Sequence, residues 1–248
     1  MKSKIKFYKD KVAINFLAKD AENGKEIYDA IEGHTAVGVL SKQFKDHKEG
    51  VTYVRNFMEK VPCVSVGLGD GDPYQGIKAA IIASKTNPGH VNQVFTSAGF
   101  ASGALNANEH NDTAINVLIS PTGTVGKVRI NTGPLSSKQN DAIIDVETAL
   151  AMILDMEAHS VKFYPMGGKK SIKELEYVAN ACSKMGIAMI EPTGGINLDN
   201  FEEILKVCLD SGIEKVMPHV YGAAIDKETG KTRVDIVEKL YEIVKRIV

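Results

Sequence analysis

The sequence is poor in cysteine and has no long hydrophobic run. Only Cys63, Cys182 and Cys208 occur among its 248 residues, and no two of them form a Cys-x-x-Cys pair. An odd number of widely spaced cysteines argues against a disulfide framework, and the missing pair argues against a zinc or redox centre. No apolar stretch approaches the roughly 18 residues that a membrane helix needs. These absences predict a soluble, cytoplasmic protein that contacts no membrane.

A surplus of charge of one sign is also missing. Lysine and arginine total 30, aspartate and glutamate total 31, and the formal net charge is −1. No global field therefore attracts nucleic acid or an anionic membrane. The N-terminal residues are charged without a following apolar segment, so we expect no secretory signal. His-x-His and His-Glu-x-x-His spacings are absent, so we expect no metal ion and no other cofactor.

Short β-branched runs alternate with longer amphipathic helical stretches along the chain. The eight strand candidates occupy residues 12–17, 36–40, 63–68, 91–96, 115–120, 161–164, 188–191 and 215–219. Eight is the number of strands in a (β/α)8 TIM barrel, and continuous apolar runs are typical of strands covered by helices. No linker rich in Pro, Gly or Ser divides the chain. The sequence therefore predicts an α/β protein with a single (β/α)8 barrel domain over residues 1–248.

Helices are predicted at 74–84, 171–185, 198–211 and 235–248. Ser171 and Glu174 match a capping box at the start of the second of these, and Gly186 suits its end. One region, 121–137, breaks the alternation and is rich in Gly, Thr and Ser. We interpret it as an inserted loop or hairpin after the fifth strand. Long loops at that end of a barrel are frequently functional.

A lysine lies inside an otherwise apolar strand in segment 160–168, which reads Ser-Val-Lys-Phe-Tyr-Pro-Met-Gly-Gly. Burying an ammonium is costly, so a buried lysine tends to lose its proton. A neutral amine is a nucleophile toward carbonyl groups. Lys162 is therefore a candidate catalytic residue. The alternative is that it lies at the strand end and reaches water.

The seventh strand ends in segment 190–197, which reads Ile-Glu-Pro-Thr-Gly-Gly-Ile-Asn. Gly194 and Gly195 allow the backbone to approach a ligand and to aim N–H groups at it. In TIM barrels the loops after strands seven and eight frequently bind phosphate. We therefore predict that Thr193, Gly194 and Gly195 bind phosphate. The alternative is that the turn is only a tight connection.

These two segments resemble the 2-keto-3-deoxy-6-phosphogluconate aldolase family. Lys-Phe-Tyr-Pro at 162–165 is similar to the family's Lys-Phe-Phe-Pro, and Pro-Thr-Gly-Gly-Ile at 192–196 matches its phosphate turn. Over the whole chain the resemblance is closer to a longer branch, the oxo-acid lyases or 4-hydroxy-2-oxoglutarate aldolases. Segments 66–69, 92–96 and 132–137 carry that closer resemblance. It covers most of the chain and implies a homo-oligomer.

The resemblance implies a carbon–carbon lyase of the class I aldolase type. Lys162 would form a Schiff base with the ketone of a 2-keto-3-deoxy-6-phospho sugar acid. Cleavage would then release pyruvate and glyceraldehyde 3-phosphate. Two alternatives stay open: a non-covalent phosphate-binding barrel isomerase or epimerase, and a metabolite-binding barrel without catalysis.

The general base needs a separate assignment, because the Ile-Glu-Ile-Thr-Leu context of the shorter aldolases is missing here. Glu191, at the end of the seventh strand, is the leading candidate, and a structural ion pair is its alternative. Asp70 and Asp72, after the third strand, are second candidates. Asp72 before Pro73 is also good helix-start chemistry.

Further residues are predicted to contact the substrate or its phosphate. They are Gln93, Thr96, Gly167, Gly168, His219 and Gly222. Gln93 and Thr96 could bind the keto acid's carboxylate, or pack inside the barrel. His219 could transfer protons, although a lone histidine is more often structural. The aldolases' Gly-Gly-Ser after strand eight is reduced here to one glycine, Gly222.

Overall fold

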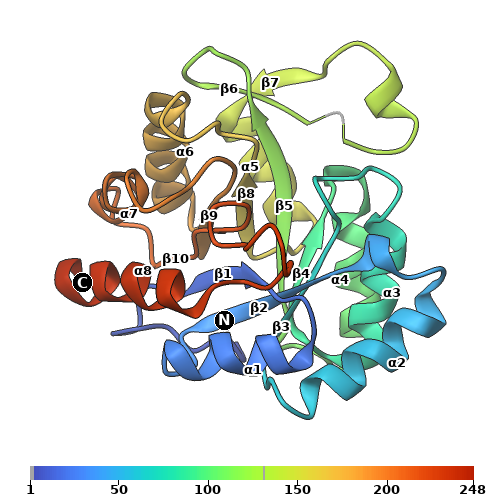
Figure 1. Ribbon diagram of the computed structural model, residues 1–248. Coiled ribbons are helices and arrows are strands. Elements are labelled where there is room, and N and C mark those ends of the chain that lie inside the picture. The colour runs from blue at the N-terminus through green and yellow to red at the C-terminus, as the bar shows by residue number, and fades with distance from the viewer. Residues whose placement is uncertain (1–2, 131) are drawn as a thin grey trace.

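Eight parallel strands form one curled sheet with helices on its outer side (Figure 1). The computed structural model describes residues 3–130 and 132–248. In spatial order the strands are β1 (Ile14–Leu17), β2 (Thr35–Leu40), β3 (Val64–Gly67), β4 (Gly89–Gln93), β5 (Ala114–Pro121), β8 (Ser160–Phe163), β9 (Met189–Pro192) and β10 (Lys215–Val216). Each strand runs parallel to its neighbour. Parallel neighbours require crossover connections, which the helices supply.

The eight predicted strands all occur, which confirms an α/β fold with a curled eight-stranded parallel sheet. The predicted closed barrel is not confirmed as such. β1 and β10 share no continuous ladder, and the edges meet through two isolated parallel bridges, Val12 with Val216 and Asn15 with His219. Pro218 lies between the bridged positions of the last strand and has no N–H to donate, which interrupts pairing at this edge.

Helices cover the outer face of the sheet. They are α1 (Ala21–Ala30), α2 (His47–Met58), α3 (Gly76–Thr86), α4 (Ala98–Asn106), α5 (Val146–Asp155), α6 (Ile172–Met185), α7 (Phe201–Asp210) and α8 (Val234–Ile247). The four predicted helices correspond to α3, α6, α7 and α8. Buried outward residues of the strands, such as Phe16 and Val117, pack with buried helix residues such as Leu240 and Leu150 in one large apolar cluster.

The end of α6 is as predicted and its start is not. Gly186 adopts a left-handed conformation at φ +82° and caps the helix. Ser171 makes no side-chain capping bond, so the predicted capping box is wrong. The reason is that the Glu174 carboxylate accepts the N–H groups of Thr122 and Gly123 at 2.9 and 3.1 Å. Glu174 therefore anchors the start of the region that follows β5.

The region after β5 contains two short strands, β6 (Lys127–Arg129) and β7 (Ile143–Asp145). β6 pairs antiparallel with the end of β5 and with β7. These strands project beyond the sheet at the top of Figure 1, together with the 3-10 turn η3 (Ser136–Lys138). Asn131, inside the predicted insertion, lies outside the described residues, as do Met1 and Lys2. The division into one domain with an insertion stays a prediction.

A second, smaller apolar cluster lies inside the curl, near the amino ends of the strands. Its buried members are Ile5, Ala13, Ala36, Cys63, Ala114, Met189 and Met217. The opposite end of the sheet interior, where the strands terminate, contains polar groups instead. Within the described ranges no helix could span a membrane; the cytoplasmic location stays a prediction.

Candidate active site

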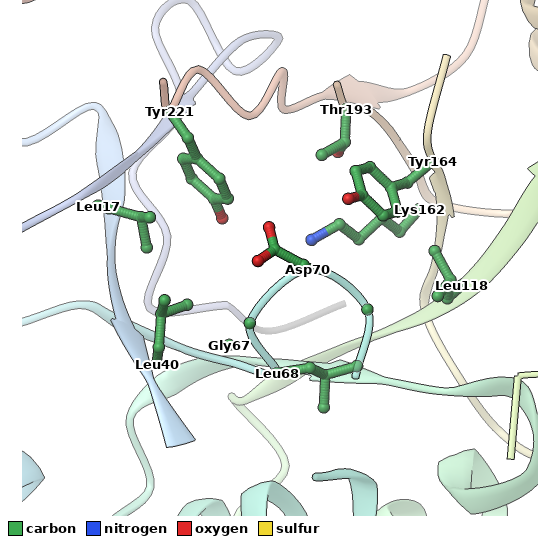
Figure 2. A pocket seen from close by; sticks show the side chains of 12 residues that line it. Leu17, Leu40, Gly67, Leu68, Asp70, Leu118, Lys162, Tyr164, Thr193 and Tyr221 are labelled. Atoms are coloured by element: carbon green, nitrogen blue, oxygen red, sulfur yellow. The ribbon is translucent and has the colours of Figure 1, made fainter. Parts of the chain in front are cut away.

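Two adjoining cavities open where the parallel strands end. The inner cavity, of about 490 Å³, is lined by Leu17, Leu40, Gly67, Leu68, Gly69, Asp70, Gly71, Leu118, Lys162, Tyr164, Thr193 and Tyr221 (Figure 2). The outer cavity, of about 680 Å³, is lined by Asp70, Tyr164, Thr193, Gly194, Gly195, Ile196, Asn197, His219, Tyr221, Gly222 and Ala223. Four residues belong to both linings, so the two cavities form one candidate site.

Lys162 projects from β8 into the inner cavity (Figure 2). Its Nζ donates a hydrogen bond to Asn92 Oδ1 at 2.8 Å. Nζ also lies 6.0 Å from the ring centroid of Tyr164 and 5.9 Å from that of Tyr221. Burial lowers the pKa of Lys162 to about 8, while the carboxylates of Glu191 and Asp70 oppose that shift. An amine with this pKa is still about nine-tenths protonated at pH 7.

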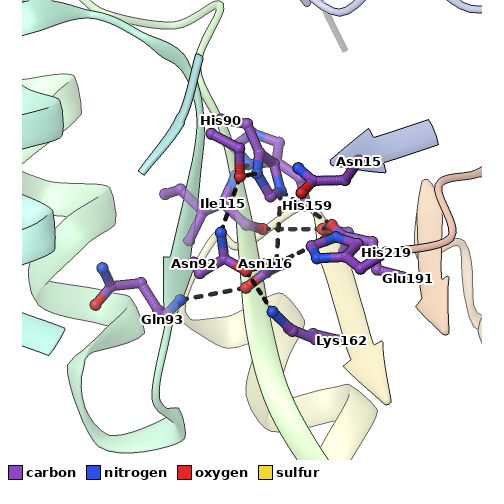
Figure 3. A network of polar contacts seen from close by, with 12 residues as sticks. Asn15, His90, Asn92, Gln93, Ile115, Asn116, His159, Lys162, Glu191 and His219 are labelled. Atoms are coloured by element: carbon purple, nitrogen blue, oxygen red, sulfur yellow. Dashed lines mark hydrogen bonds and ion pairs between the residues drawn. The ribbon is translucent and has the colours of Figure 1, made fainter. Parts of the chain in front are cut away.

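Glu191 lies beneath the cavity, fully buried, and lines neither cavity. Its Oε1 accepts from His90 Nε2 at 3.1 Å and from Ser160 Oγ at 2.5 Å. Its Oε2 accepts from His219 Nε2 at 2.7 Å and from Asn116 Nδ2 at 2.6 Å (Figure 3). Burial alone would raise the pKa of Glu191, but His90 and His219 outweigh it and hold the pKa well below its usual value. Glu191 is therefore a fixed anion.

His219 links this carboxylate to the cavity. Burial and the charge of Lys162 lower the pKa of His219 to about 3, so its ring is neutral at neutral pH. Because an ionised carboxylate only accepts, Nε2 carries the proton toward Glu191 and Nδ1 is an acceptor. The Tyr221 hydroxyl lies 2.9 Å from Nδ1 and 2.8 Å from Asn15 Oδ1. Burial raises the pKa of Tyr221, which therefore stays a neutral phenol.

Asp70 supplies a carboxylate to the cavity from the loop after β3. Its backbone is left-handed, with φ +51°, between Gly69 at +88° and Gly71 at +69°. This conformation turns the side chain inward, toward the space that Lys162 and Tyr221 also face (Figure 2). The neighbouring Asp72 instead accepts from Tyr74 N at 3.0 Å and from Gln75 Nε2 at 3.1 Å. The predicted helix start at Asp72 and Pro73 is wrong, because α3 begins at Gly76 after Gln75, and Asp72 instead holds the turn before the helix. Asp70 is the carboxylate that faces the cavity.

The outer cavity offers backbone donors. Within residues 3–130 and 132–248, no acceptor faces the N–H groups of Gly194, Gly195, Gly222 and Ala223. All four residues line this cavity. Unpaired N–H groups gathered around a hollow are the usual components of an anion site. The geometry is therefore suited to a phosphate.

The Gly167–Gly168 turn has a different role from the one predicted. Gly168 N–H donates to Gly194 O at 2.8 Å, and Met166 N–H donates to Thr193 O at 3.0 Å. A Cβ on Gly195 would lie 2.5 Å from Gly168 N. Gly167 and Gly168 line neither cavity, so these glycines let the β8 and β9 loops pack backbone against backbone.

Gln93 and Thr96 also lie away from the cavities. Gln93 is buried with its Oε1 accepting from Ser97 Oγ at 2.7 Å, and its side chain points away from Lys162 (Figure 3). Thr96 is exposed in the turn η2 (Phe95–Ser97). The structure therefore brings together Lys162, Thr193, Gly194, Gly195, His219 and Gly222 at one site. It separates Gln93, Thr96, Gly167 and Gly168 from that site.

Five functional candidates were missed from the sequence or given no role. They are His90, Asn92, Asn116, Tyr164 and Tyr221. His90 and Asn92 on β4 and Asn116 on β5 are buried polar residues. The spacing of two between His90 and Asn92 was the available signal, because alternate residues of a strand face one side. Across the described parts of the chain, no group of three or more His, Cys, Asp or Glu is arranged for a metal.

Comparison with known proteins adds to this geometry. The KDGP aldolase family model matches residues 8–228. This chain belongs to the KDGP aldolase family. A protein of Salmonella typhimurium (strain 14028s / SGSC 2262) named 2-dehydro-3-deoxy-phosphogluconate aldolase is 54% identical over 244 residues, which cover 98% of this chain and 99% of that relative. The family resemblance predicted from the sequence is thus confirmed, while the longer branch stays a prediction.

Solved structures similar to this KDGP aldolase family member support its fold. Thiamine phosphate pyrophosphorylase from Pyrococcus furiosus has a TM-score of 0.58 at 13% identity, with 97% of this chain and 98% of that chain covered. KGPDC from Streptococcus mutans has a TM-score of 0.58 at 11% identity, covering 95% and 98%. The corresponding values for 3-hexulose-6-phosphate synthase from Salmonella typhimurium are 0.55, 12%, 94% and 99%.

The predicted class I reaction is wrong as stated. The sequence predicted Schiff-base cleavage of 2-keto-3-deoxy-6-phosphogluconate, but the matching family is KDGP aldolase, and the relative's name does not give the position of the phosphate. The surroundings of Lys162 supply a physical reason. Burial lowers the pKa of Lys162 only to about 8, because the carboxylates of Glu191 and Asp70 oppose the shift, so most of the amine is protonated at pH 7 and donates to Asn92. A protonated amine has no lone pair with which to attack a ketone.

Proposed function

We propose that this KDGP aldolase family member is a carbon–carbon lyase that cleaves a small phosphorylated sugar-derived oxo acid without a covalent intermediate. The observation that carries the proposal is that Lys162 and Asp70 face the same cavity, which continues to the unpaired N–H groups of Gly194 and Gly222. Membership of an aldolase family supports an enzyme over a non-catalytic binding protein. We also infer that the curled sheet closes as a (β/α)8 barrel through the bridges between its first and last strands.

Lys162 acts in this proposal as a fixed positive charge. Its ammonium binds the oxygen of the substrate's 2-oxo group. When the carbon–carbon bond breaks, negative charge develops on that oxygen as an enolate. A charge already in place stabilises this enolate without reorganisation.

Asp70 transfers the proton. Its carboxylate takes the proton from the hydroxyl group beside the bond that breaks. That alkoxide becomes an aldehyde, and the bonding electron pair passes to the oxo acid as the enolate. The Asp70 carboxyl then returns the proton to the enolate carbon, so the enzyme ends the cycle unchanged.

The phosphate binds in the outer cavity. Backbone N–H groups of Gly194, Gly195, Gly222 and Ala223 are available as donors there. The four leucines of the inner cavity suit the deoxygenated part of a sugar acid, because a methylene group needs no hydrogen-bond partner. The homo-oligomer predicted from the resemblance stays a prediction.

Asp70→Asn tests the proton transfer. Asparagine tolerates the left-handed backbone at this position, so the loop is retained. We expect cleavage of phosphorylated 2-oxo-3-deoxy sugar acids to fall about a hundredfold or more. Asp72→Asn, which removes the same charge two residues away, is the matched control and should retain most activity. Equal losses in both variants would contradict the role of Asp70.

Borohydride separates the non-covalent proposal from a Schiff base. The wild-type protein is incubated with cleavable substrate and sodium borohydride, digested, and analysed by mass spectrometry. We expect no reduced adduct and no loss of activity, because no iminium forms. A stable adduct on the peptide that contains Lys162 would overturn the non-covalent role.

A further inference from the structure

The two carboxylate oxygens of Glu191 are fully occupied by hydrogen bonds, so neither can accept a proton from substrate. A carboxylate accepts about four hydrogen bonds, and Glu191 accepts four, from His90, Ser160, His219 and Asn116. Its exposed fraction is 0%. Substrate in either cavity therefore cannot reach its oxygen atoms. The charge on this carboxylate is nevertheless permanent, because every one of these four neighbours donates to it.

A short chain of hydrogen bonds connects this charge to the cavity. Asn116 Nδ2 donates to Glu191 Oε2 at 2.6 Å and to Asn92 Oδ1 at 2.9 Å. Asn92 Oδ1 also accepts from Lys162 Nζ at 2.8 Å. Asn92 is itself held by Ser65 Oγ and Val66 O, to which its Nδ2 donates at 3.0 and 3.3 Å. The lysine amine is thus placed by side chains whose positions depend on Glu191.

We propose that Glu191 is a positioning residue for Lys162: a buried carboxylate, fixed by four donors, whose charge keeps the cavity lysine an ammonium. The inference deepens the proposed function, on which it rests for the catalytic role of that ammonium. Glu191 touches no substrate and moves no proton. It acts through Asn116 and Asn92, and through its electric field across the interior of the sheet.

The other charged or titratable groups around Lys162 do not replace this carboxylate. Asp70 faces the amine from the loop after β3, but it is accessible from the cavity, and the field of an exposed charge is weakened by water. His219, after β10, is neutral at neutral pH, and Tyr221 is a neutral phenol. Burial likewise raises the pKa of Tyr164, at the end of β8, so it too is neutral. His90, on β4, faces Glu191 and donates to it.

Trace labelling with acetic anhydride tests the inference without requiring turnover. Only a neutral amine is acetylated, so the labelling of Lys162 across pH, measured by mass spectrometry, reports its pKa. In the wild-type protein we expect half-maximal labelling near pH 8. In Glu191→Gln the midpoint should fall by about one pH unit or more, which raises labelling at pH 7 about fivefold. In the same variant, the fall of kcat/KM on the alkaline side of the pH profile should move to the same lower pH.

Two further variants keep the test decisive. Glu174→Gln removes another buried carboxylate, on α6 and outside both cavity linings, and should leave the labelling midpoint of Lys162 unchanged. Asn92→Asp places a new carboxylate beside the Lys162 amine. It should raise the labelling midpoint of Lys162 and so reduce its labelling at pH 7 about tenfold. If Glu191→Gln does not fold, Asn92→Asp alone decides whether the interior sets the charge of the lysine.

The inference is overturned if folded Glu191→Gln labels like the wild-type protein, or if Asn92→Asp fails to raise the midpoint. Failure of the proposed function gives a different result. In that case no phosphorylated oxo acid is cleaved, or Asp70→Asn stays active, while the labelling midpoints still shift as described.

Discussion

The two ends of the curled sheet differ in what fills its interior. Near the amino ends of the strands the inward side chains are apolar, at Ala13, Cys63, Ala114, Met189 and Met217. Two residues further along the same strands the side chains are polar, at Asn15, Ser65, Asn116, Glu191 and His219. Side chains two apart in a strand face the same side, so an apolar layer lies directly beneath a polar one.

The difference shows how one fold separates stability from chemistry. The apolar layer excludes water from below, so the hydrogen bonds of the polar layer lie in a medium of low dielectric constant. Burial in that medium disfavours the charged form of a base, which is why the pKa of Lys162 and that of His219 both lie well below their usual values. We expect substitutions in the apolar (lower) layer to change the free energy of unfolding and those in the polar (upper) layer to change catalytic activity.

Lys162→Met should have the largest effect. Among the described residues it removes the only cation that lines the inner cavity, so we expect kcat to fall about a thousandfold. The free energy of unfolding should not fall, since methionine avoids the cost of burying a charge. Steady-state kinetics and urea unfolding measure the two effects. Lys206→Met, on the outer surface of α7, is the control; turnover of Lys162→Met within about tenfold of the wild type would refute the role of the charge.

Met189→Ala should show the opposite pattern. Met189 is fully buried in the lower layer, and its truncation opens a cavity that costs about 3 kcal/mol of unfolding free energy. We expect kcat of the remaining folded protein to stay within a fewfold of the wild-type value. Met152→Ala makes the same change at an exposed position of α5 and should cost far less. A large loss of kcat without loss of stability would contradict the division between layers.

The third predicted effect is smaller: His219, in the polar layer, should make the free energy of unfolding depend on pH. The pKa of His219 is about 3 in the folded protein and about 6.5 in the unfolded chain, which therefore binds a proton that the folded state does not. The unfolding free energy should consequently fall as the pH drops from about 6.5 toward about 3. One proton contributes about 1.4 kcal/mol per pH unit to that slope.

Urea unfolding between about pH 6.5 and about pH 4 measures this slope. His219→Gln should reduce the slope of unfolding free energy against pH by the contribution of one proton. His47→Gln, at the start of α2, is the control, because it leaves the number of protons bound by the buried network unchanged. Identical slopes in the wild type and His219→Gln would show that His219 is protonated in the folded state.

The sheet and its lysine could be predicted because their signals are local. Each strand is a short apolar run, and Lys162 stands out within one of them. Of the network around it, Glu191 and His219 were predicted as functional residues, but their hydrogen-bond partners on β4 and β5 were not. His90 fell outside the predicted strand at 91–96, although β4 begins at Gly89. Asn92 and Asn116 acquire a role only when the register of β4 and β5 places them opposite each other.

The alternation of side chains along β4 explains why Gln93 lies away from the candidate site. Asn92 points into the sheet interior, so its neighbour Gln93 must point to the other side. Thr96 lies beyond the end of β4, where the alternation no longer applies. Tyr221 lies in an irregular segment after β10, and its position depends on His219 and Asn15, which come from opposite ends of the chain.

The interlocked turns after β8 and β9 have a consequence for the length of the substrate. Gly168 N–H and Met166 N–H donate to the carbonyl groups of Gly194 and Thr193, so the strand that carries Lys162 is tied to the turn that we propose binds phosphate. These bonds hold Lys162 and the Gly194–Gly195 turn at a fixed separation. Under the proposed function, this separation limits substrate length: an oxo acid one carbon shorter or longer would not reach both Lys162 and the turn.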